Sequence, residues 1–311
     1  MIEKTRVIFF GTSAFAVPVL EALSAVADIR LVITRPDAPA GRGKNLQSSP
    51  IRARAESLNL NVLTPGPVNN SDFYKVIDNA QPEAAVLAAY GKILPLELLR
   101  IPAKGFLNVH PSLLPRHRGP SPISGAILAG DAQTGVTLIL LDQEMDHGPV
   151  IAQRSITIEP HEHHPSLEQR LAMLAAEMLQ SSLLPFLEGR ITPQTQNHDQ
   201  ATFTKLLKRQ DGLIDWSQEA ATIAKQIRAY DPWPGTATQF HNQPLKILDG
   251  RAVDGQASEP AGTVINHLGQ PAFVCGRGLL THIMVQPANG KPMTAADFAN
   301  GQRDFIGHRL G

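Results

Sequence analysis

Residues 6–34 have the sequence RVIFFGTSAFAVPVLEALSAVADIRLVIT, in which two short apolar runs flank a helical pattern. Arg6–Phe10 and Leu31–Thr34 are rich in β-branched and aromatic side chains, which favour strands. Pro18–Val26 lies between them and has the apolar spacing of an amphipathic helix. The segment therefore predicts a strand–helix–strand unit, the building block of α/β folds.

The same alternation continues through the first half of the chain. It predicts further strands at residues 61–63, 84–89, 105–109 and 136–141, and further helices at residues 51–58, 72–80 and 121–128. Apolar strands that alternate with helices favour a parallel sheet covered on both faces, so we predict a doubly wound, mostly parallel sheet. Ligands of such sheets bind beyond the carboxyl ends of the strands. We therefore expect the chemistry to follow Phe10, Ala89, Val109 and Leu141.

The pattern changes in the second half. Ser166–Leu187 predicts a long amphipathic helix, and the polar residues after it show no clear period. Beyond a predicted helix at Glu219–Ala229, glycine, proline and short strand-like runs dominate. We predict three parts: an α/β catalytic domain at residues 1–188, a linker at residues 189–204, and a smaller, mostly β domain at residues 205–311.

The composition is that of an ordinary folded protein. The chain has 311 residues, of which 42% are hydrophobic and 18% charged, and its formal net charge is zero. Its single cysteine, Cys275, has no partner for an intramolecular disulfide or a CxxC metal site. No apolar run reaches the roughly 20 residues of a membrane helix, and the first residues lack the features of a secretory signal. We expect a cytoplasmic monomer without membrane contact.

The charge distribution has one local feature. A nucleic-acid binder usually carries a basic excess, which the whole chain lacks. Residues 35–54, however, contain five basic residues against the single acid Asp37: Arg35, Arg42, Lys44, Arg52 and Arg54. Such a charge run is usually a solvated loop, so these residues alone leave contact with a nucleic acid open.

The most informative stretch is GFLNVHPSLLP, residues 105–115. Strand side chains alternate between the faces of a sheet, so Asn108 and His110 point to the same side. They stand at the carboxyl end of a buried strand, which Pro111 ends. Burying an unsatisfied amide or imidazole costs roughly 1–3 kcal/mol, so such a pair requires partners or a function. We interpret it as part of a ligand site.

A second stretch, VTLILLDQEMDHG at residues 136–148, is a predicted strand that leads into an acidic loop. One of its carboxylates, Asp142, Glu144 or Asp146, would reach His110 if the two strands are neighbours. A carboxylate beside a histidine orients the ring and raises its basicity. Asp and Gly are also common in turns, which is the alternative for this loop taken alone.

Two other segments do not match ligand-binding motifs. His161-Glu162-His163-His164 lacks HExxH spacing and lies between prolines, so we expect a surface loop there and no metal site. Neither GTSAFA after the first strand nor GRGKN at residues 41–45 is a GxGxxG motif or a P-loop. The missing glycine fingerprint argues against a nicotinamide-dependent dehydrogenase, the α/β alternative.

Together these motifs resemble the formyltetrahydrofolate-dependent formyltransferase family. NVHPSLLPRHRGPSPI at residues 108–123, followed by MDHGPVI at residues 145–151, is similar to the Asn-x-His, Ser-Leu-Leu-Pro and Asp-before-Gly signatures of that family. The usual Trp-Arg-Gly is His117-Arg118-Gly119 here, and the common Leu-Asp-Thr-Gly is Met145-Asp146-His147-Gly148. Both departures flank the key residues without replacing them.

The resemblance extends over nearly the whole chain. It includes GTSAFA at residues 11–16, the loop from Arg35 to Pro50, DGLIDW at residues 211–216 and KPMTAADFANG at residues 291–301. The loop and the two later segments resemble the members that act on methionyl-tRNA. The resemblance implies a formyltransferase-like α/β domain followed by an OB-like β-barrel, which would supply a second surface for the RNA backbone.

The resemblance also implies roles for particular residues. Asn108, His110 and Asp146 match the catalytic positions of the family. The region of the folate pocket is matched by Ser112, Leu113, Leu114 and Pro115, with Tyr90 and Gly91 on the neighbouring loop. Arg42, with Lys44 beside it, matches the position that reaches the tRNA acceptor stem. The implied substrates are 10-formyltetrahydrofolate and initiator methionyl-tRNA, without a metal.

The implied reaction is attack of an amine on a formyl carbon, through a tetrahedral intermediate with a developing oxyanion. Such a site requires hydrogen-bond donors for the oxyanion and a group that takes the amine proton. Our hypothesis is that Asn108 and His110 stabilise the oxyanion, while Asp146 is the base or orients His110; the sequence leaves both open.

Two alternatives keep part of this pattern. A formyltransferase acting on a sugar or ribonucleotide amine would use the same three residues, but the loop at residues 35–50 and the DFANG segment favour tRNA. The other alternative is a non-catalytic RNA-binding module, and the presence of Asn108, His110 and Asp146 together argues against it.

Overall fold

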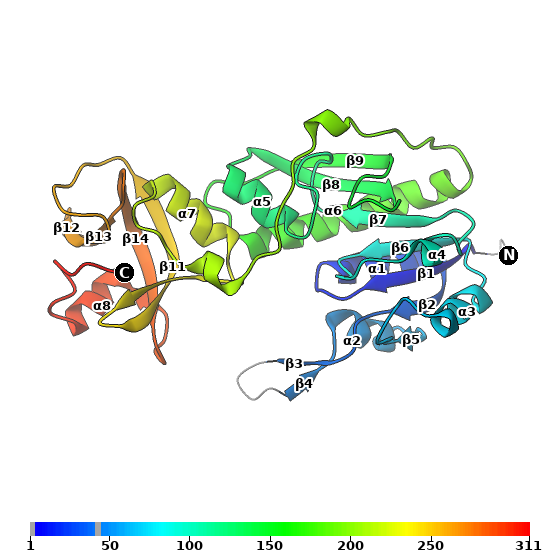
Figure 1. Cartoon of the computed structure of the whole chain (residues 1–311), viewed down its shortest axis with the longest axis horizontal. Coiled ribbons are helices and arrows are strands. Elements are labelled where there is room, and N and C mark those ends of the chain that lie inside the picture. Colours follow the sequence, from blue (N-terminus) through cyan, green and yellow to red (C-terminus); the bar gives the residue numbers. More distant parts are fainter. Residues whose placement is uncertain (1–3, 41–44) are drawn as a thin grey trace. The chain divides into compact units, whose positions relative to one another are not determined.

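The computed structural model describes residues 4–40 and 45–311, and the chain divides into two compact units (Figure 1). The first unit comprises Met1–Pro122, Gln133–Thr157 and Glu168–Lys205. The second comprises Ile123–Ala132, Ile158–Leu167 and Leu206–Gly311. The units therefore alternate along the sequence, and the domain boundaries at residues 188 and 205 stay a prediction.

The sheet of the first unit has seven strands in the order β5-β2-β1-β6-β7-β8-β9. Their bounds are β1 Arg6–Gly11, β2 Asp28–Ile33, β5 Val62–Leu63, β6 Ala84–Ala88, β7 Phe106–His110, β8 Gln133–Leu140 and β9 Val150–Thr157. The strands from β5 to β7 pair in parallel, whereas β8 and β9 pair antiparallel. This confirms the predicted mostly parallel α/β sheet.

The direction of β8 corrects one expectation. Thr137 of β8 pairs with His110, and Leu140 pairs with Leu107, so β8 ends beside the start of β7. The expectation that Leu141 leads to the same edge as Val109 is wrong. An apolar strand has the same period-2 pattern in either direction, so its sequence does not reveal which way it runs.

Some short or half-exposed elements of the first unit were not predicted. These are the hairpin of β3 (Ala38–Ala40) with β4 (Asn45–Gln47), the helix α4 (Leu96–Leu99), and the edge strand β9. The outer half of β9 is largely exposed and carries polar residues, so it lacks a continuous apolar run. Short elements give too few residues for a period to be recognised.

The longer helices lie close to their predicted positions. They are α1 Ala16–Val26, α2 Pro50–Ser57, α3 Ser71–Asn79, α5 Pro122–Ala129 and α6 His164–Leu187. Ser49 caps α2 by accepting a hydrogen bond from the backbone N–H of Arg52, and Asn70 caps α3 through Phe73 in the same way. These caps satisfy N–H groups that a helix leaves unpaired at its start. No helix among the described residues is long and apolar enough to cross a membrane.

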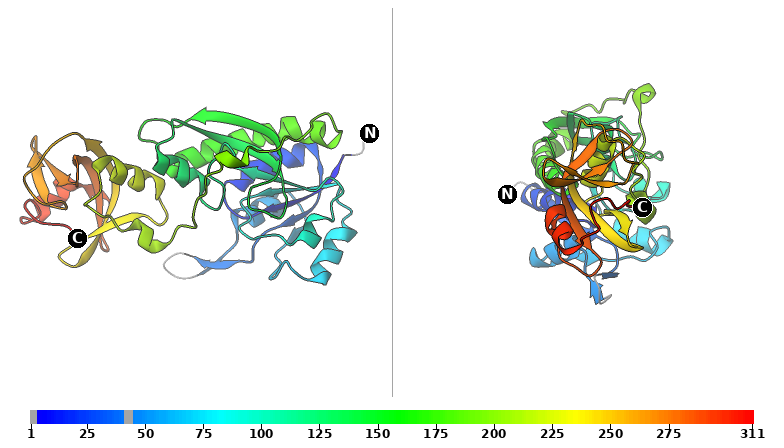
Figure 2. Two further views of the ribbon diagram at one scale, coloured as in Figure 1. Left: turned by 45° about the horizontal axis from the view of Figure 1, so that its top comes forward. Right: turned by 90° about the vertical axis from the view of Figure 1, so that its left-hand side faces the viewer.

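Strand β1 shows how the core is built. Ile8 and Phe10 pack in a cluster with residues of α3 and α4, including Phe73. Val7 and Phe9 point to the opposite face and are fully buried as well. Both faces of the sheet are therefore covered, as in a doubly wound fold (Figures 1 and 2).

The second unit contains a six-stranded antiparallel sheet, and the helices α7 (Ala220–Ala229) and α8 (Ala295–Gly301) contact it. Five strands have the order β10-β11-β14-β13-β12, and β15 pairs with β14. The bounds are α7 Ala220–Ala229, β10 Thr236–Phe240, β11 Gln243–Val253, β12 Val264–His267, β13 Gln270–Val274, β14 Leu279–Pro287, β15 Met293–Thr294 and α8 Ala295–Gly301. The core includes Trp216, Phe273 and Phe305, with α8 beside the strands (Figure 2). This confirms the predicted β domain.

Candidate active site

Strand β7 presents Asn108 and His110 on the same face, as their spacing predicts. The loop between β8 and β9 brings the carboxylate of Asp146 to both. Asn108 Nδ2 donates a hydrogen bond to Asp146 Oδ1 at 3.2 Å, and His110 Nδ1 lies 3.4 Å from the same oxygen. The structure thus brings together the three residues that the sequence singles out.

Asp146 is the centre of this cluster. Its second oxygen accepts a hydrogen bond from the backbone N–H of Gly119 at 2.8 Å, so two donors and an imidazole nitrogen converge on one carboxylate. An ionised carboxylate only accepts hydrogen bonds, which matches these neighbours. The backbone of Asp146 has a φ of 50°, a region that Asp adopts more readily than most residues. The side chain is 13% exposed, so a small part of it remains accessible.

His110 is buried and has neighbours at both ring nitrogens. Nε2 lies 3.0 Å from the backbone oxygen of His117. A carbonyl only accepts hydrogen bonds, so Nε2 carries a hydrogen and donates it. Nδ1 therefore faces Asp146 with the ring held in one orientation, and a proton between these two atoms would bind them together.

The loop that carries Asp146 is held by Gln196, which lies in the predicted linker. Gln196 Nε2 donates to the backbone oxygens of Asp146 and Gly148, at 2.9 and 2.7 Å. Gln196 Oε1 accepts two hydrogen bonds from the guanidinium of Arg118, at 3.2 and 2.7 Å. Both Gln196 and Arg118 are buried. The interpretation of residues 189–204 as a mere linker missed this contribution.

The same segment also holds residues 117–121. Thr202 Oγ1 accepts from the backbone N–H of His117, and Thr204 Oγ1 accepts from that of Ser121. Gly119 approaches this segment so closely that a Cβ atom there would lie 2.8 Å from the Thr204 backbone oxygen. The N–H of Gly119 is thereby fixed against Asp146. The only sequence signal for these contacts is a polar stretch without period.

His147, one of the departures from the family pattern, belongs to a second chain of contacts. Its Nδ1 lies 2.6 Å from Asp142 Oδ2, and its ring stacks on His198 with the ring centres 4.0 Å apart. His198 Nδ1 lies 2.8 Å from Arg118 Nη2. A guanidinium only donates, so this nitrogen of His198 accepts and is unprotonated. Asp142 therefore supports the loop, while Asp146 is the carboxylate that reaches His110.

The segment predicted to line the folate pocket is held by hydrogen bonds from side chains of the neighbouring strands β8 and β9. Thr137 Oγ1 donates to the Ser112 backbone oxygen and accepts from the Leu114 N–H, at 2.6 and 3.1 Å. Gln153 Nε2 donates to the Leu114 oxygen at 2.9 Å. Ser112 and Leu114 are buried, whereas Leu113 and Pro115 are partly exposed.

The neighbouring loop follows β6, next to β7 in the sheet. Gly91 is exposed with a φ of 77°, and the guanidinium of Arg35 lies beside it. The Tyr90 side chain is fully buried against Phe10, and its hydroxyl has no hydrogen-bond partner among the described residues. Burial raises the pKa of Tyr90 to about 12, although Arg35 acts in the opposite direction. The Tyr90 side chain therefore packs in the core and is not exposed on the surface of the loop.

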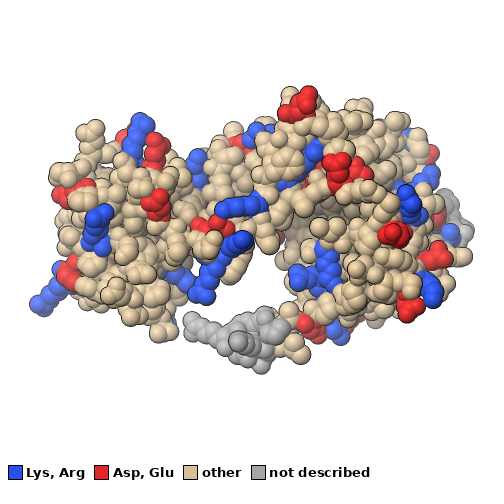
Figure 3. Space-filling model, viewed as in Figure 1, with Lys and Arg blue, Asp and Glu red and all other residues tan. Residues whose placement is uncertain are grey.

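The basic segment is partly neutralised within the described residues. Arg52 pairs with Asp37 at 3.0 Å, and Arg54 pairs with Glu21 at 2.7 Å. Arg42 and Lys44, the residues matched to tRNA contact, lie outside the described residues. Charges of both signs are interspersed on the face drawn in Figure 3.

The histidine-rich segment at residues 161–164 corrects another expectation. Only His161 is exposed, and Glu162 is buried, so the segment is not simply a surface loop. His163 pairs with Asp231 and Asp249 at 3.1 and 3.4 Å. The hydrogen bond to Asp249 is the main cause that raises the pKa of His163.

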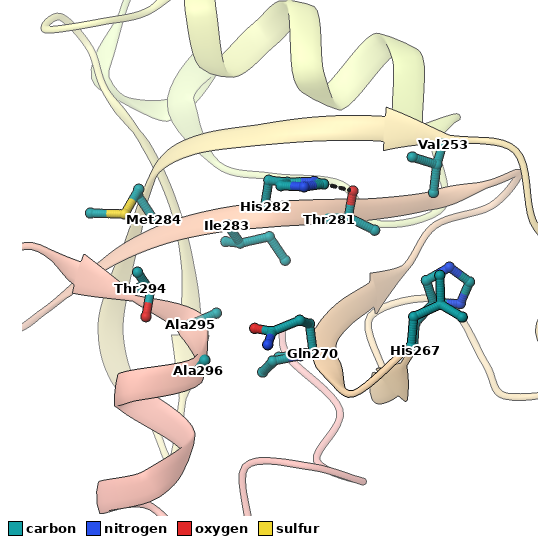
Figure 4. Close-up of a pocket in the computed structure, with 12 residues that line it drawn as sticks. Val253, His267, Gln270, Thr281, His282, Ile283, Met284, Thr294, Ala295 and Ala296 are labelled. Atoms are coloured by element: carbon teal, nitrogen blue, oxygen red, sulfur yellow. Dashed lines mark hydrogen bonds between the residues drawn. The ribbon is translucent and has the colours of Figure 1, made fainter.

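A cavity of about 580 Å³ lies in the second unit (Figure 4). Ile283, Met284 and Pro271 give it apolar walls, and His282 stands on β14 with a φ of 51°. None of the described residues predicted for catalysis or for the folate pocket lines it.

Comparison with known proteins agrees with this arrangement. Residues 4–183 match the family model described as formyl transferase, and residues 206–303 match its C-terminal domain. The chain therefore belongs to the formyl transferase family.

Within this family, the chain is similar over nearly its full length to methionyl-tRNA formyltransferases. The chain is 46% identical to a methionyl-tRNA formyltransferase of Roseiflexus sp. (strain RS-1), over 98% of this chain and 95% of that protein. It is 39% identical to the methionyl-tRNA formyltransferase of Solibacter usitatus, over 98% of each.

Solved structures share the fold at low sequence identity. HypX from Aquifex aeolicus in complex with tetrahydrofolic acid matches with a TM-score of 0.61 and 15% identity, over 97% of this chain and 48% of that chain. WlaRD, a sugar 3N-formyl transferase, matches with a TM-score of 0.65 and 16% identity, over 93% of this chain and all of that chain.

Proposed function

We propose that this protein transfers the formyl group of 10-formyltetrahydrofolate to the α-amine of initiator methionyl-tRNA. The observation that carries the proposal is the meeting of Asn108, His110 and Asp146 within 3.2–3.4 Å in a chain of this family. Near full-length similarity to methionyl-tRNA formyltransferases supports the acceptor.

Asn108 is suited to the oxyanion. One of its two side-chain N–H groups is used by Asp146, and the other remains for the oxygen of the formyl group as it becomes negative. Asn108 is 7% exposed and its donor is already oriented, so little reorganisation is needed when charge develops. A pre-oriented donor of this kind is typically worth about 10²–10³ in kcat.

Asp146 and His110 are suited to take the proton of the attacking amine. The amine nitrogen forms a bond to the formyl carbon while losing a proton, and the C–N10 bond to the folate breaks in the second step. The leaving N10 then receives a proton, so the reaction has no net proton change. His110 Nδ1 and Asp146 Oδ1 lie 3.4 Å apart, so a proton taken by one of them has the other beside it. The proposal allows either His110 or Asp146 to accept the proton of the amine first.

The folate co-substrate would lie along the edge formed by the loops after β6 and β7. Leu113 and Pro115 are apolar and partly exposed there, and Gly91 exposes backbone beside Arg35. Tyr90, buried in the core, would act by fixing the loop rather than by contact. Ser112 and Leu114 would act through the backbone that Thr137 holds.

Recognition of the tRNA is proposed for Arg42 and Lys44 together with the C-terminal domain. Phosphate contacts by such residues would make binding salt-dependent. We further propose that the protein acts in the cytoplasm, because its product is consumed where translation starts, and that it acts as a monomer.

A formylation assay tests the proposal. Purified protein is mixed with 10-formyltetrahydrofolate and, in parallel, initiator methionyl-tRNA, elongator methionyl-tRNA and an amino-sugar nucleotide. Rapid formylation of the initiator tRNA alone is expected. Formylation of the amino-sugar nucleotide without reaction of either tRNA would contradict the proposal and indicate a formyltransferase that acts on small molecules.

A further inference from the structure

Three potential metal ligands meet at the surface of the second unit. His241, Asp304 and His308 each offer one ligand atom, and all three atoms lie within 4.8 Å of one another. His241 Nε2 and Asp304 Oδ2 are already 2.6 Å apart. This is the only such group of at least three His, Cys, Asp or Glu side chains within residues 4–40 and 45–311.

The backbone fixes His241 in an unusual position. It is the first of the two residues, His241 and Asn242, that connect β10 to β11, with Phe240 paired to Gln243. Both turn residues have positive φ, 49° and 58°. Such a tight hairpin turn most often has Asn, Asp or Gly at these positions, and histidine also tolerates a positive φ. The turn directs its imidazole toward Asp304.

The other two ligands come from the end of the chain, after α8. Phe305 lies between them in sequence and is fully buried, which anchors this segment to the core. Gly307 has a φ of 89°, so the chain turns between Asp304 and His308. The His308 oxygen accepts from the N–H of Val264 on β12. All three side chains are thus carried by backbone that the fold holds in place.

The three side chains lie close together at the surface. His241 and His308 meet edge to face with their centres 4.7 Å apart, and Phe240 supports His308 from one side at 4.6 Å. The His241 and Asp304 side chains are 50% and 59% exposed. Solvent therefore has access, and water can complete the coordination.

We propose that His241, Asp304 and His308 form a site for a divalent transition-metal ion, of which Zn²⁺ is the representative. Imidazole and carboxylate are usual ligands of Zn²⁺, at about 2.0–2.2 Å, which places tetrahedral ligand atoms roughly 3.3 Å apart. The separations here, from 2.6 Å to at most 4.8 Å, bracket that value. Rotation of exposed side chains closes the difference.

Binding places the metal ion where a hydrogen now lies. A ligating imidazole nitrogen must carry no hydrogen, so the hydrogen that His241 Nε2 donates to Asp304 moves to Nδ1 of the same ring, which keeps the imidazole neutral. The ion joins residues separated by 63 positions and ties the β10–β11 hairpin to the end of the chain. The Gly311 N–H already donates to the Gln239 oxygen beside it, so the ion strengthens an existing contact. The site therefore has a structural role, in a different unit from Asp146.

The test uses the tag-free full-length protein, treated with chelator and titrated with Zn²⁺ alone. Calorimetry is expected to give one equivalent per chain, and Zn²⁺ is expected to raise the melting temperature. His308→Gln and His241→Asn are expected to weaken this binding by at least about 100-fold, since even indirect partners of a metal ligand contribute 10–100-fold. Asparagine suits the positive φ at position 241, so that variant keeps the turn.

Asp304→Asn and His267→Gln complete the design. The first keeps the shape of a ligand but removes its charge, and is expected to weaken binding as well. The second removes a histidine of the same unit that is not in the cluster, and is expected to bind like the wild type. Absence of stoichiometric binding by the wild type, or equal binding by wild type and His308→Gln, would overturn the proposal.

Discussion

Gln196 provides a sharp test of how the site is held. Replacing it by alanine removes the donor to the backbone oxygens of Asp146 and Gly148 and one acceptor of the buried Arg118 guanidinium, whose Nη2 keeps His198 Nδ1. Each unsatisfied buried group costs about 1–3 kcal/mol, and water would compensate part of this sum. We expect the free energy of unfolding to fall by about 2–4 kcal/mol. The loop of Asp146 would then be displaced.

Displacement of a reacting group by about 1 Å lowers a rate by about 10²-fold. The assay is single-turnover formylation with saturating folate and tRNA, at a temperature where circular dichroism shows the variant to be folded. Gln194→Ala is the matched control, because Gln194 is the same residue type two positions away, with its side chain exposed and its backbone paired to Val150. If Gln196→Ala matches this control in rate and stability, the reasoning about the loop is refuted.

Gln196→Glu separates the two halves of this contact. The carboxylate keeps an acceptor for Arg118, but it has no N–H for the backbone oxygens of Asp146 and Gly148. We expect the rate of formyl transfer to fall more than stability in this variant. An unchanged rate would mean that the donor half of Gln196 is unimportant for the position of Asp146.

The remaining predictions concern stability and reactivity. Hydrogen bonding to Asp249 raises the pKa of His163 above its ordinary value. Protonated His163 therefore stabilises the folded protein fully below pH 6.5, and this contribution is lost as the pH rises through the pKa of His163 in the folded protein. The melting temperature should fall more between pH 6 and 8 in the wild type than in Asp249→Asn. Gly119→Ala should destabilise more than Gly189→Ala, because both have positive φ but only position 119 meets backbone within 3 Å; equal melting temperatures would contradict this. Burial raises the pKa of the Cys275 thiol to about 11, so a thiol reagent at pH 8 should modify it only after unfolding.

Much of the fold could be predicted because its signals are local. Strands such as β1 and β6 are continuous apolar runs, and helices such as α3 have polar caps and an amphipathic period. The direction of β8 could not be predicted, since it depends on the path of the chain through α5. Strand β9 was missed because half of it is polar and solvent-exposed.

The site divides in the same way. Asn108 and His110 could be predicted as a pair, because two residues apart on a strand means one face of the sheet. Gln196 and His198 could not, since their partners are distant in sequence and their own segment has no period. Hydrogen bonds to backbone oxygens, such as those of Asp146 and Gly148, place no constraint on the sequence around them.

The central claim is that the Asn108–His110–Asp146 cluster performs formyl transfer. The most direct measurement is the single-turnover rate of formylation of initiator methionyl-tRNA by the wild type and by Asp146→Asn. Asparagine tolerates the φ of 50° at this position, so the backbone is preserved while the carboxylate is lost. The account predicts a rate lower by at least about 10²-fold, with folate binding unchanged. A rate within about threefold of the wild type would contradict it.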